Sequence, residues 1–177
     1  MLKNSFFAVA IILTAVFSIS FFGNFDFSRN YINLPLLISV YLIIQSHYER
    51  GFIFAAGAGL IFDMYSSSTA GTYTLAMVVP LVVMFYAFRS LFARKSMYAI
   101  ILMMIVSTIM YHLFIWGLTE FFYLVNWREF RSSINSDYII SLCVQLSVHV
   151  ALIVCIHALS LLVGRHVVHR FRLNPRV

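Results

Sequence analysis

Charged residues are scarce in this sequence of 177 residues. They make up 10% of it, and only six are acidic, whereas 62% of the residues are hydrophobic. A water-soluble domain could not bury so much apolar surface, so the composition argues against that class of protein. Long stretches nearly free of charge are typical of helices in lipid. Because the apolar runs are continuous rather than alternating, the pattern does not fit a membrane barrel.

Cysteine is rarer still, with two residues in the chain. Cys143 and Cys155 lie in the same apolar segment. A straight helix would separate them by about 18 Å, so they cannot form a disulfide bond within that helix. We expect both to be small buried residues.

Motifs for catalysis or metal binding are missing as well. The sequence contains no CxxC, GxSxG, zincin or GxGD-type pattern, and His112, His149 and His157 do not have the short-range spacing of metal or haem ligands. The six carboxylates include no obvious pair for general acid and base catalysis. We therefore expect no metal, no cofactor and no enzymatic activity.

Six apolar segments follow one another along the chain. Cutting the sequence at charges and turn-forming residues gives the segments 5–22, 31–46, 51–62, 72–88, 97–118 and 138–164. They predict an all-α, polytopic membrane bundle of six transmembrane helices, of which the third is short. We expect one transmembrane domain over 1–164 and a basic cytoplasmic tail over 165–177.

The basic residues predict the orientation of this bundle. Nine of them fall on the side of the N-terminus and three on the other side, and an excess of basic residues marks the cytoplasmic side. Both termini are therefore predicted to be cytoplasmic, in a multi-pass membrane protein. The nine are Lys3, Arg50, Arg89, Arg94, Lys95, Arg165, Arg170, Arg172 and Arg176, and the three are Arg29, Arg128 and Arg131.

Two basic stretches on the predicted cytoplasmic side are candidate contact regions. One is the loop with Arg89, Arg94 and Lys95, and the other is the tail with Arg165, Arg170 and Arg172. The tail fits a short basic helix end that holds anionic lipid headgroups, and docking to a cytoplasmic protein is the alternative. Nucleic acid is not an expected partner, because the charge is distributed as the membrane rule requires.

The first segment raises a separate question of processing. Lys3 precedes an apolar run that ends near the small residues Ser18 and Ser20, as in a secretory signal. The run is long for a signal core. We therefore expect an uncleaved membrane anchor.

The third segment ends at an aspartate. From Gly51 to Asp63 a helix rises only about 18–20 Å, which is less than the ~30 Å thickness of the hydrocarbon layer. Asp63 would then lie around 10 Å below the outer boundary, where a charge is costly unless it faces protein or water. This position is a candidate functional site.

Glycines are concentrated around this aspartate. Gly51, Gly57 and Gly59 remove side-chain bulk from the third segment, and Gly71 closes the polar turn that follows. Small residues let another helix backbone approach closely in lipid. We expect a helix-packing or partner-binding surface here, and we expect the third segment to be the most enclosed of the six.

Polar side chains of two other segments reach the same depth as Asp63. His112 and Gln145 each lie ~9–11 Å from the outer end of their helices, and His149 lies one turn deeper than Gln145 on the same face. We predict a buried polar cluster of Asp63, His112 and Gln145, with His149 beside it. Such residues most often tie helices together. A proton relay or a ligand pocket is the alternative.

The stretch GFIFAAGAGLIFDMYSSSTAGTYTLAMVVPLVVMFYAF, residues 51–88, resembles the core of the bacterial rod shape-determining protein MreD family. Gly59, Asp63 and Gly71 carry the resemblance, and Thr69 and Leu75 support it. The segment LPLLISVYLII, residues 34–44, fits the second helix of that family. Total length, six spans and a short basic C-terminal end agree as well.

The resemblance implies a non-enzymatic scaffold of the complex that builds lateral peptidoglycan and maintains cell shape. Members of the family bind the bitopic protein MreC. They help to connect MreB filaments to a SEDS glycosyltransferase and its penicillin-binding protein. The family is similar in fold to the S components of energy-coupling-factor transporters, so a vitamin-sized ligand is the alternative. Residues that could line its cavity are Asp63, Tyr73, His112, Glu120 and Gln145.

Overall fold

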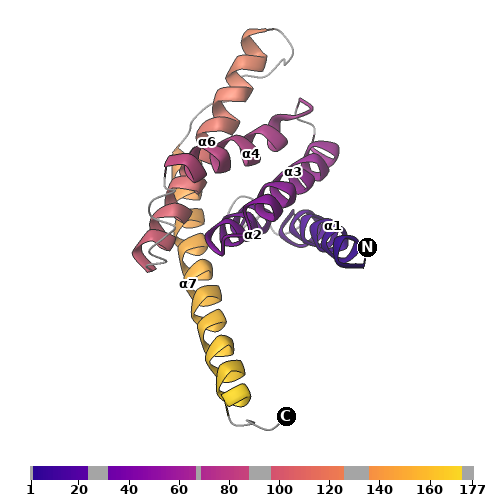
Figure 1. The fold of residues 1–177 in the computed structure, drawn as a ribbon. Coiled ribbons are helices and arrows are strands. Elements are labelled where there is room, and N and C mark those ends of the chain that lie inside the picture. The colour runs from indigo at the N-terminus through magenta and orange to yellow at the C-terminus, as the bar shows by residue number, and fades with distance from the viewer. Residues whose placement is uncertain (1, 24–31, 67–68, 88–96, 126–135, 173–177) are drawn as a thin grey trace.

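The computed structural model describes residues 2–23, 32–66, 69–87, 97–125 and 136–172. In these residues the chain is all-α, without a strand, and each predicted apolar segment corresponds to one helix (Figure 1). Two stretches, Met97–Leu124 and Tyr138–Ser160, are long and apolar enough to cross a membrane. The helices are α1 (Leu2–Gly23), α2 (Leu34–Ile44), α3 (Tyr48–Tyr65), α4 (Thr72–Ala87), α6 (Met97–Leu124) and α7 (Ser136–Arg172).

Both basic stretches of the sequence are described incompletely or not at all. The loop with Arg89, Arg94 and Lys95 lies outside the described residues. Helix α7 continues through 165–172, so the predicted boundary between residues 164 and 165 is not a helix end. The side chains of Arg165 and the arginines after it lie outside the described part.

The short helix of the bundle is α2, not α3, which corrects the prediction. Helix α3 has 18 residues and rises about 27 Å, because the charged residues before Gly51 and the residues after Asp63 also belong to it. Helix α2 has 11 residues and rises only about 16 Å. The helix alone is therefore shorter than a hydrocarbon layer of ~30 Å.

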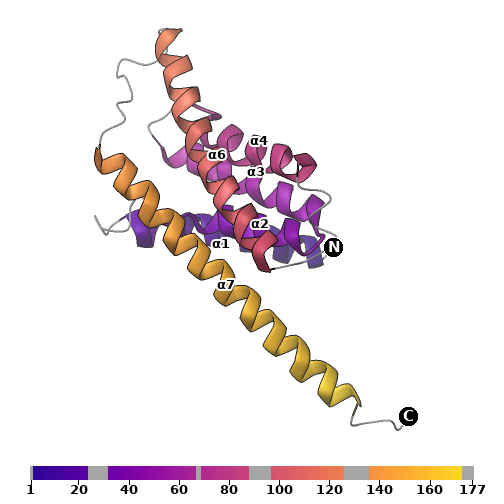
Figure 2. The same ribbon diagram turned by 90° about the vertical axis from the view of Figure 1, so that its left-hand side faces the viewer.

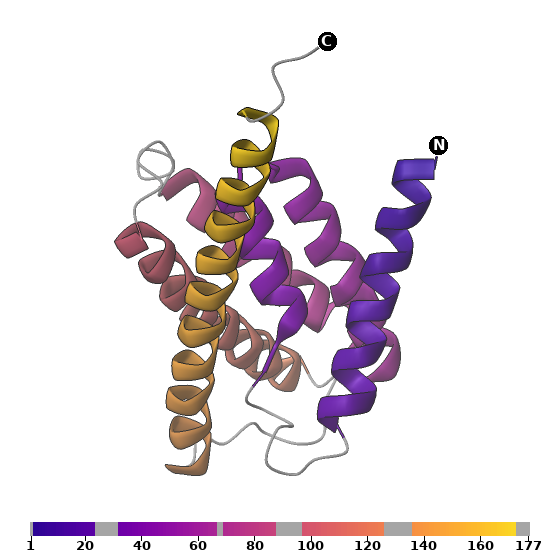
Figure 3. The same ribbon diagram turned by 90° about the horizontal axis from the view of Figure 1, so that it is seen from below.

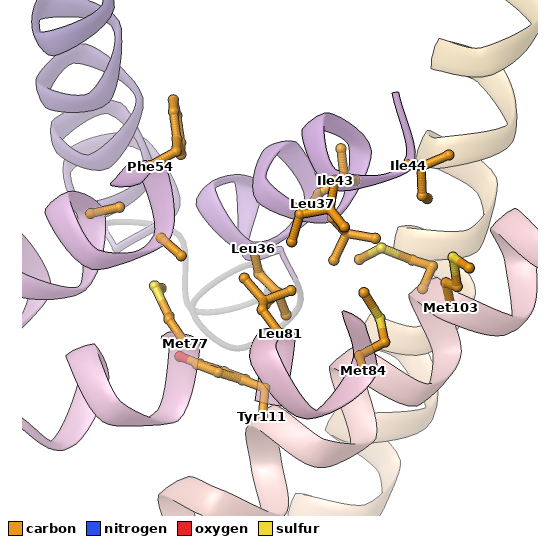
Figure 4. Packing of buried hydrophobic residues seen from close by; sticks show 14 of the residues in the cluster. Leu36, Leu37, Ile43, Ile44, Phe54, Met77, Leu81, Met84, Met103 and Tyr111 are labelled. Atoms are coloured by element: carbon orange, nitrogen blue, oxygen red, sulfur yellow. The ribbon is translucent and has the colours of Figure 1, made fainter. Parts of the chain in front are cut away.

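Helix α2 is also the most enclosed helix, in place of the third segment. Seven of its 11 residues are buried, compared with five of the 18 residues of α3. It contacts each of the other five helices, and Figure 3 shows it between α1 and α7. The buried cluster forms around it, as Figure 4 shows for Leu36 and Leu37 of α2 with Leu81 and Met84 of α4 and Met103 of α6.

Both ends of α2 follow from the sequence around them. Asn33 caps the start, because its Oδ1 accepts from the N–H of Leu36 at 3.1 Å, and Pro35 has no N–H to satisfy. At the other end the N–H of Ser46 donates to the carbonyl of Ile43 and the N–H of His47 to that of Leu42, which is a Schellman motif. Ser46 has the positive φ of 69° that this motif requires.

Replacing Ser46 by glycine should stabilise the protein. A non-glycine residue at positive φ is strained by its Cβ, and Ser46 is exposed, so no packing is lost with its side chain. We expect a gain of about 0.5–1 kcal/mol, measured as a higher thermal unfolding midpoint in detergent. Ser46→Ala retains the Cβ and serves as the control. Equal midpoints for the two variants would contradict this account.

The glycines of α3 face three different helices. A Cβ on Gly51 would lie 2.6 Å from Ile43 Cγ1 of α2, and one on Gly57 would lie 3.1 Å from Ile11 Cγ2 of α1. A Cβ on Gly59 would lie 2.6 Å from the Cα of Thr74 in α4. These glycines therefore serve packing within the chain, and the partner-binding alternative does not apply to the surfaces that the neighbouring helices cover.

Helix α7 is attached to the bundle along one face. It packs against α6 and, more weakly, against α2, and its far end extends beyond the other helices (Figure 2). Its buried residues Gln145, His149 and Ile153 are each one turn apart. Cys143 and Cys155 lie on the exposed side and are free thiols, so the expectation that they are buried was wrong.

Candidate functional site

Polar side chains join α6 to α7 in two successive pairs. His112 Nε2 lies 2.5 Å from Gln145 Oε1, and Thr108 Oγ1 lies 3.1 Å from His149 Nδ1. The two helices are antiparallel, so one turn back along α6 corresponds to one turn forward along α7. The structure thus brings His112 and Gln145 together and places His149 in the next pair. Gln145 and His149 are 3% and 0% exposed, so these contacts lie inside the protein.

His112 is held between two partners from α7. A glutamine Oε1 can only accept, so His112 Nε2 carries a hydrogen and donates to it. The other ring nitrogen, Nδ1, lies 2.9 Å from the hydroxyl of Tyr138. A tyrosine hydroxyl can donate or accept, so this contact persists whether or not Nδ1 carries a hydrogen.

His149 has a more restrictive set of partners. The backbone N–H of Asn33 donates to His149 Nε2 at 3.0 Å, so this nitrogen carries no hydrogen. The Thr108 hydroxyl donates to the carbonyl of Met104 at 2.9 Å and therefore accepts from Nδ1–H of His149. Both contacts are satisfied only by the neutral Nδ1–H tautomer. His149 is thus a structural link between α6, α7 and the start of α2.

This link satisfies the buried N-terminus of the central helix. The first N–H groups of a helix have no partner within it and need one when they are buried. Asn33 supplies two acceptors, since its Oδ1 accepts from Leu36 and its backbone carbonyl from Leu37. The N–H of Asn33 itself is satisfied by His149, 116 residues further along the chain.

Asp63 has different partners from those predicted. Its Oδ1 accepts from the N–H of Tyr73 at 2.8 Å, and its Oδ2 accepts from the N–H and the hydroxyl of Thr74 at 3.1 and 2.6 Å. Asp63 and His112 share no hydrogen bond. The predicted cluster of Asp63, His112 and Gln145 is therefore two separate groups, because Asp63 faces α4 and the other two residues face each other.

The carboxylate of Asp63 caps helix α4 from a neighbouring helix. Of the first four N–H groups of α4, those of Tyr73 and Thr74 donate to Asp63. Those of Thr72 and Leu75 donate to the backbone carbonyls of Thr69 and Gly71. All four are satisfied, and a negative charge at this end is favoured by the helix dipole.

Gly59, Asp63 and Gly71 belong to one joint between α3 and α4. Gly59 lets Thr74 approach the backbone of α3, and Asp63, one turn later, binds the same threonine. Gly71 has a φ of +90° and immediately precedes α4. We call these three residues, together with Thr74, the α3–α4 joint.

Asp63 variants should lose stability in proportion to the acceptors that they remove. Asp63→Asn keeps one acceptor and should cost about 1 kcal/mol, whereas Asp63→Ala removes all three bonds and should cost about 2 kcal/mol. Thermal unfolding midpoints in detergent give the order. Glu49→Gln, at an exposed acid in the first turn of α3, is the matched control and should have little effect. An alanine variant as stable as the asparagine variant would contradict the capping role.

Sequence reasoning missed three participants of the contacts around His112 and His149. Asn33 could have been found from its position before Leu34 and Pro35, since this is the pattern of a helix N-cap. Thr108 precedes His112 by one turn, just as Gln145 precedes His149, so the two helices carry matching polar pairs. Tyr138, seven residues before Gln145, gave no clear signal.

The ring nitrogens of both site histidines are already engaged within the protein. Neither His112 nor His149 therefore presents a free base or ligand. In the described part of the chain no group of three or more His, Cys, Asp or Glu residues is placed to hold a metal ion. Comparison of the chain with models of protein families, with curated proteins and with solved structures finds no significant match.

Proposed function

We propose that this chain is a multi-pass scaffold of the bacterial inner membrane that takes part in lateral cell-wall synthesis, as the MreD family does. The α3–α4 joint carries the proposal. Gly59, Asp63 and Gly71, the residues on which the resemblance rests, act together to fix one helix crossing. These three residues share one structural role, so their resemblance to the MreD family is more specific than a resemblance in hydropathy alone.

The state of the polar groups favours a scaffold over a catalyst. Catalytic groups must be free to exchange a proton or bind a substrate, and they are arranged as nucleophile and base or as acid and base. Here Asp63 caps a helix, and His112 and His149 cross-link helices. These side chains fix helix positions, as a binding surface in lipid requires.

The proposed partner is a single-pass membrane protein of the MreC type. Through it, and through cytoplasmic MreB filaments, the scaffold would contribute to placing a SEDS glycosyltransferase and its penicillin-binding protein. In this proposal both termini are cytoplasmic, in agreement with the nine basic residues on that side. Membrane lipids surround the helices.

Co-expression with the MreC-type protein of the same genome tests the proposal. We expect the two proteins to elute together after affinity purification in mild detergent, while an unrelated single-pass protein with an equally long span does not bind. A chain that purifies without the partner would count against the scaffold. Adjacency of its gene to MreB and MreC genes would support it.

The same purification tests the transporter alternative. An S-component-like protein should retain a vitamin-sized ligand, which mass spectrometry of the purified sample would detect. Asp63→Asn distinguishes a further role, since a scaffold that needs only hydrogen bonds should still bind its partner. Loss of function with intact assembly would point to proton transfer through Asp63 instead.

A further inference from the structure

A hydrogen bond connects the buried start of α2 to helix α7, between the N–H of Asn33 and Nε2 of His149. We call it the α2–α7 bond. It exists only while Nε2 carries no hydrogen, because a backbone N–H can donate but cannot accept. The other ring nitrogen already donates to the hydroxyl of Thr108. A proton taken up by this histidine therefore goes to Nε2, where two N–H groups would then face each other.

Protonation has a different effect on His112, the other histidine of the site. Its Nε2 donates to Gln145, and its Nδ1 lies 2.9 Å from the hydroxyl of Tyr138. That hydroxyl can accept from a protonated Nδ1 and can donate to an unprotonated one. Both contacts of His112 therefore persist when the ring takes up a proton, whereas the α2–α7 bond does not.

The described groups around His149 do not neutralise a charged ring. On α6 the nearby titratable group is His112, and a charge on that ring would repel a charge on His149. On α2 the ring faces Asn33, which does not titrate, and Tyr111 of α6 lies beside Asn33. Among the described residues no carboxylate is bonded to His149, and Asp63 is bonded to α4 instead. A proton on His149 is therefore uncompensated while α7 stays in contact with α2.

Helix α7 can separate from α2 while the hydrophobic core stays in place. Among the side chains described in 138–160, Ile153 is the one member of the buried cluster that α7 contributes. The remaining members come from the other five helices. We propose that His149 makes the contact between α7 and the start of α2 sensitive to pH, because a neutral ring holds the two helices together and a protonated ring releases them. This inference needs only contacts within the chain and is independent of the proposed function.

Nuclear magnetic resonance of the full-length, isotope-labelled protein in lipid bilayers tests this release. The nitrogen shifts of the ring report which nitrogen carries hydrogen, and at neutral pH we expect hydrogen on Nδ1 of His149 and none on Nε2. Hydrogen exchange at the amides of Asn33, Leu36 and Leu37 is followed from about pH 7.5 to about pH 3.5, a range that includes the ordinary titration of histidine near 6.5.

The protection of these three amides should decrease with pH. The bonded state binds one proton fewer than the released state, so its advantage is complete above about pH 6.5 and is lost as the pH falls. After correction for the intrinsic exchange rate, protection should fall by up to about tenfold for each pH unit below that value, since release takes up one proton.

His149→Gln is the matched variant for this titration. The glutamine Oε1 can accept from the N–H of Asn33 but does not titrate, so the three amides should keep their protection over the whole range. Both proteins retain Asp63, so the comparison removes any effect of acid at the α3–α4 joint. His112→Gln should remain as sensitive to acid as the wild-type protein, because its own contacts tolerate a proton.

Three results would overturn the proposal. These are hydrogen on Nε2 of His149 at neutral pH, wild-type protection that persists over the whole range, or an equal loss of protection in His149→Gln. If glutamine prevents folding, the first two results of the wild-type titration decide the question. The protein is measured without a partner, so a failure to bind the single-pass partner would refute the proposed function and leave this result unchanged.

Discussion

Gly59→Ala should destabilise the protein by about 2–3 kcal/mol, more than any other single-methyl change at a described glycine. A Cβ at this position would lie 2.6 Å from Thr74 Cα and 3.1 Å from Thr74 N. Both are backbone atoms, so α4 as a whole would have to move away from α3. That movement would also stretch the bonds from Thr74 to Asp63. Thermal unfolding in detergent measures the loss.

The other glycines provide graded controls for this prediction. At Gly117 nothing lies within 4 Å of the added Cβ, so alanine should stabilise α6 by up to about 1 kcal/mol through helix propensity. At Gly57 the nearest atom is a side-chain methyl group, Ile11 Cγ2 at 3.1 Å, which needs to move by only a few tenths of an ångström, so the change should cost much less than Gly59→Ala. Gly51 should fall between Gly57 and Gly59. A Gly59→Ala protein as stable as the Gly57→Ala protein would show that α4 can shift freely.

The helices themselves could be predicted from the sequence because continuous apolar runs between charges are a strong signal. The residues at which the helices begin and end were harder to predict. The segment 31–46 looks longer than 51–62, yet α2 has 11 residues and α3 has 18. The cap at Asn33 and the left-handed residue Ser46 shorten α2, and both are local signals that hydropathy ignores. Helix α3 is longer than predicted because the segment was cut at charged residues. Glu49 and Arg50 at its start and Asp63 near its end are charged but belong to the helix.

The polar groups show what a depth argument can and cannot reveal. Equal depth in two helices placed His112 and Gln145 at the same level, and the structure joins them. Depth gives no information about the direction in which a side chain points around the helix axis. Asp63 points to the start of α4, where unpaired N–H groups attract a carboxylate. The role of His149 depends on a backbone N–H 116 residues away, which no sequence pattern specifies.

His149→Leu should open the contact between α7 and the start of α2. Leucine has a similar volume but cannot accept from the N–H of Asn33, which would be left unpaired in a buried site. Leaving such a group unsatisfied costs about 1–3 kcal/mol. Hydrogen exchange at residues 33–37 should rise, since these amides depend on the cap. Thermal unfolding would report the total loss.

Two variants of neighbouring residues separate this backbone contact from ordinary side-chain contacts. Thr108→Val removes the bond to His149 Nδ1 together with the hydroxyl's bond to the Met104 carbonyl of its own helix, and it leaves the Asn33 contact in place. His112→Leu breaks bonds to side chains that can rotate towards other partners. Interhelical side-chain bonds in membrane proteins average about 0.6 kcal/mol, so both variants should cost less than His149→Leu. Neither should raise exchange at 33–37. If Thr108→Val raised it as much as His149→Leu, the backbone bond would not be the main function of the histidine, and the start of α2 would depend on α6 instead.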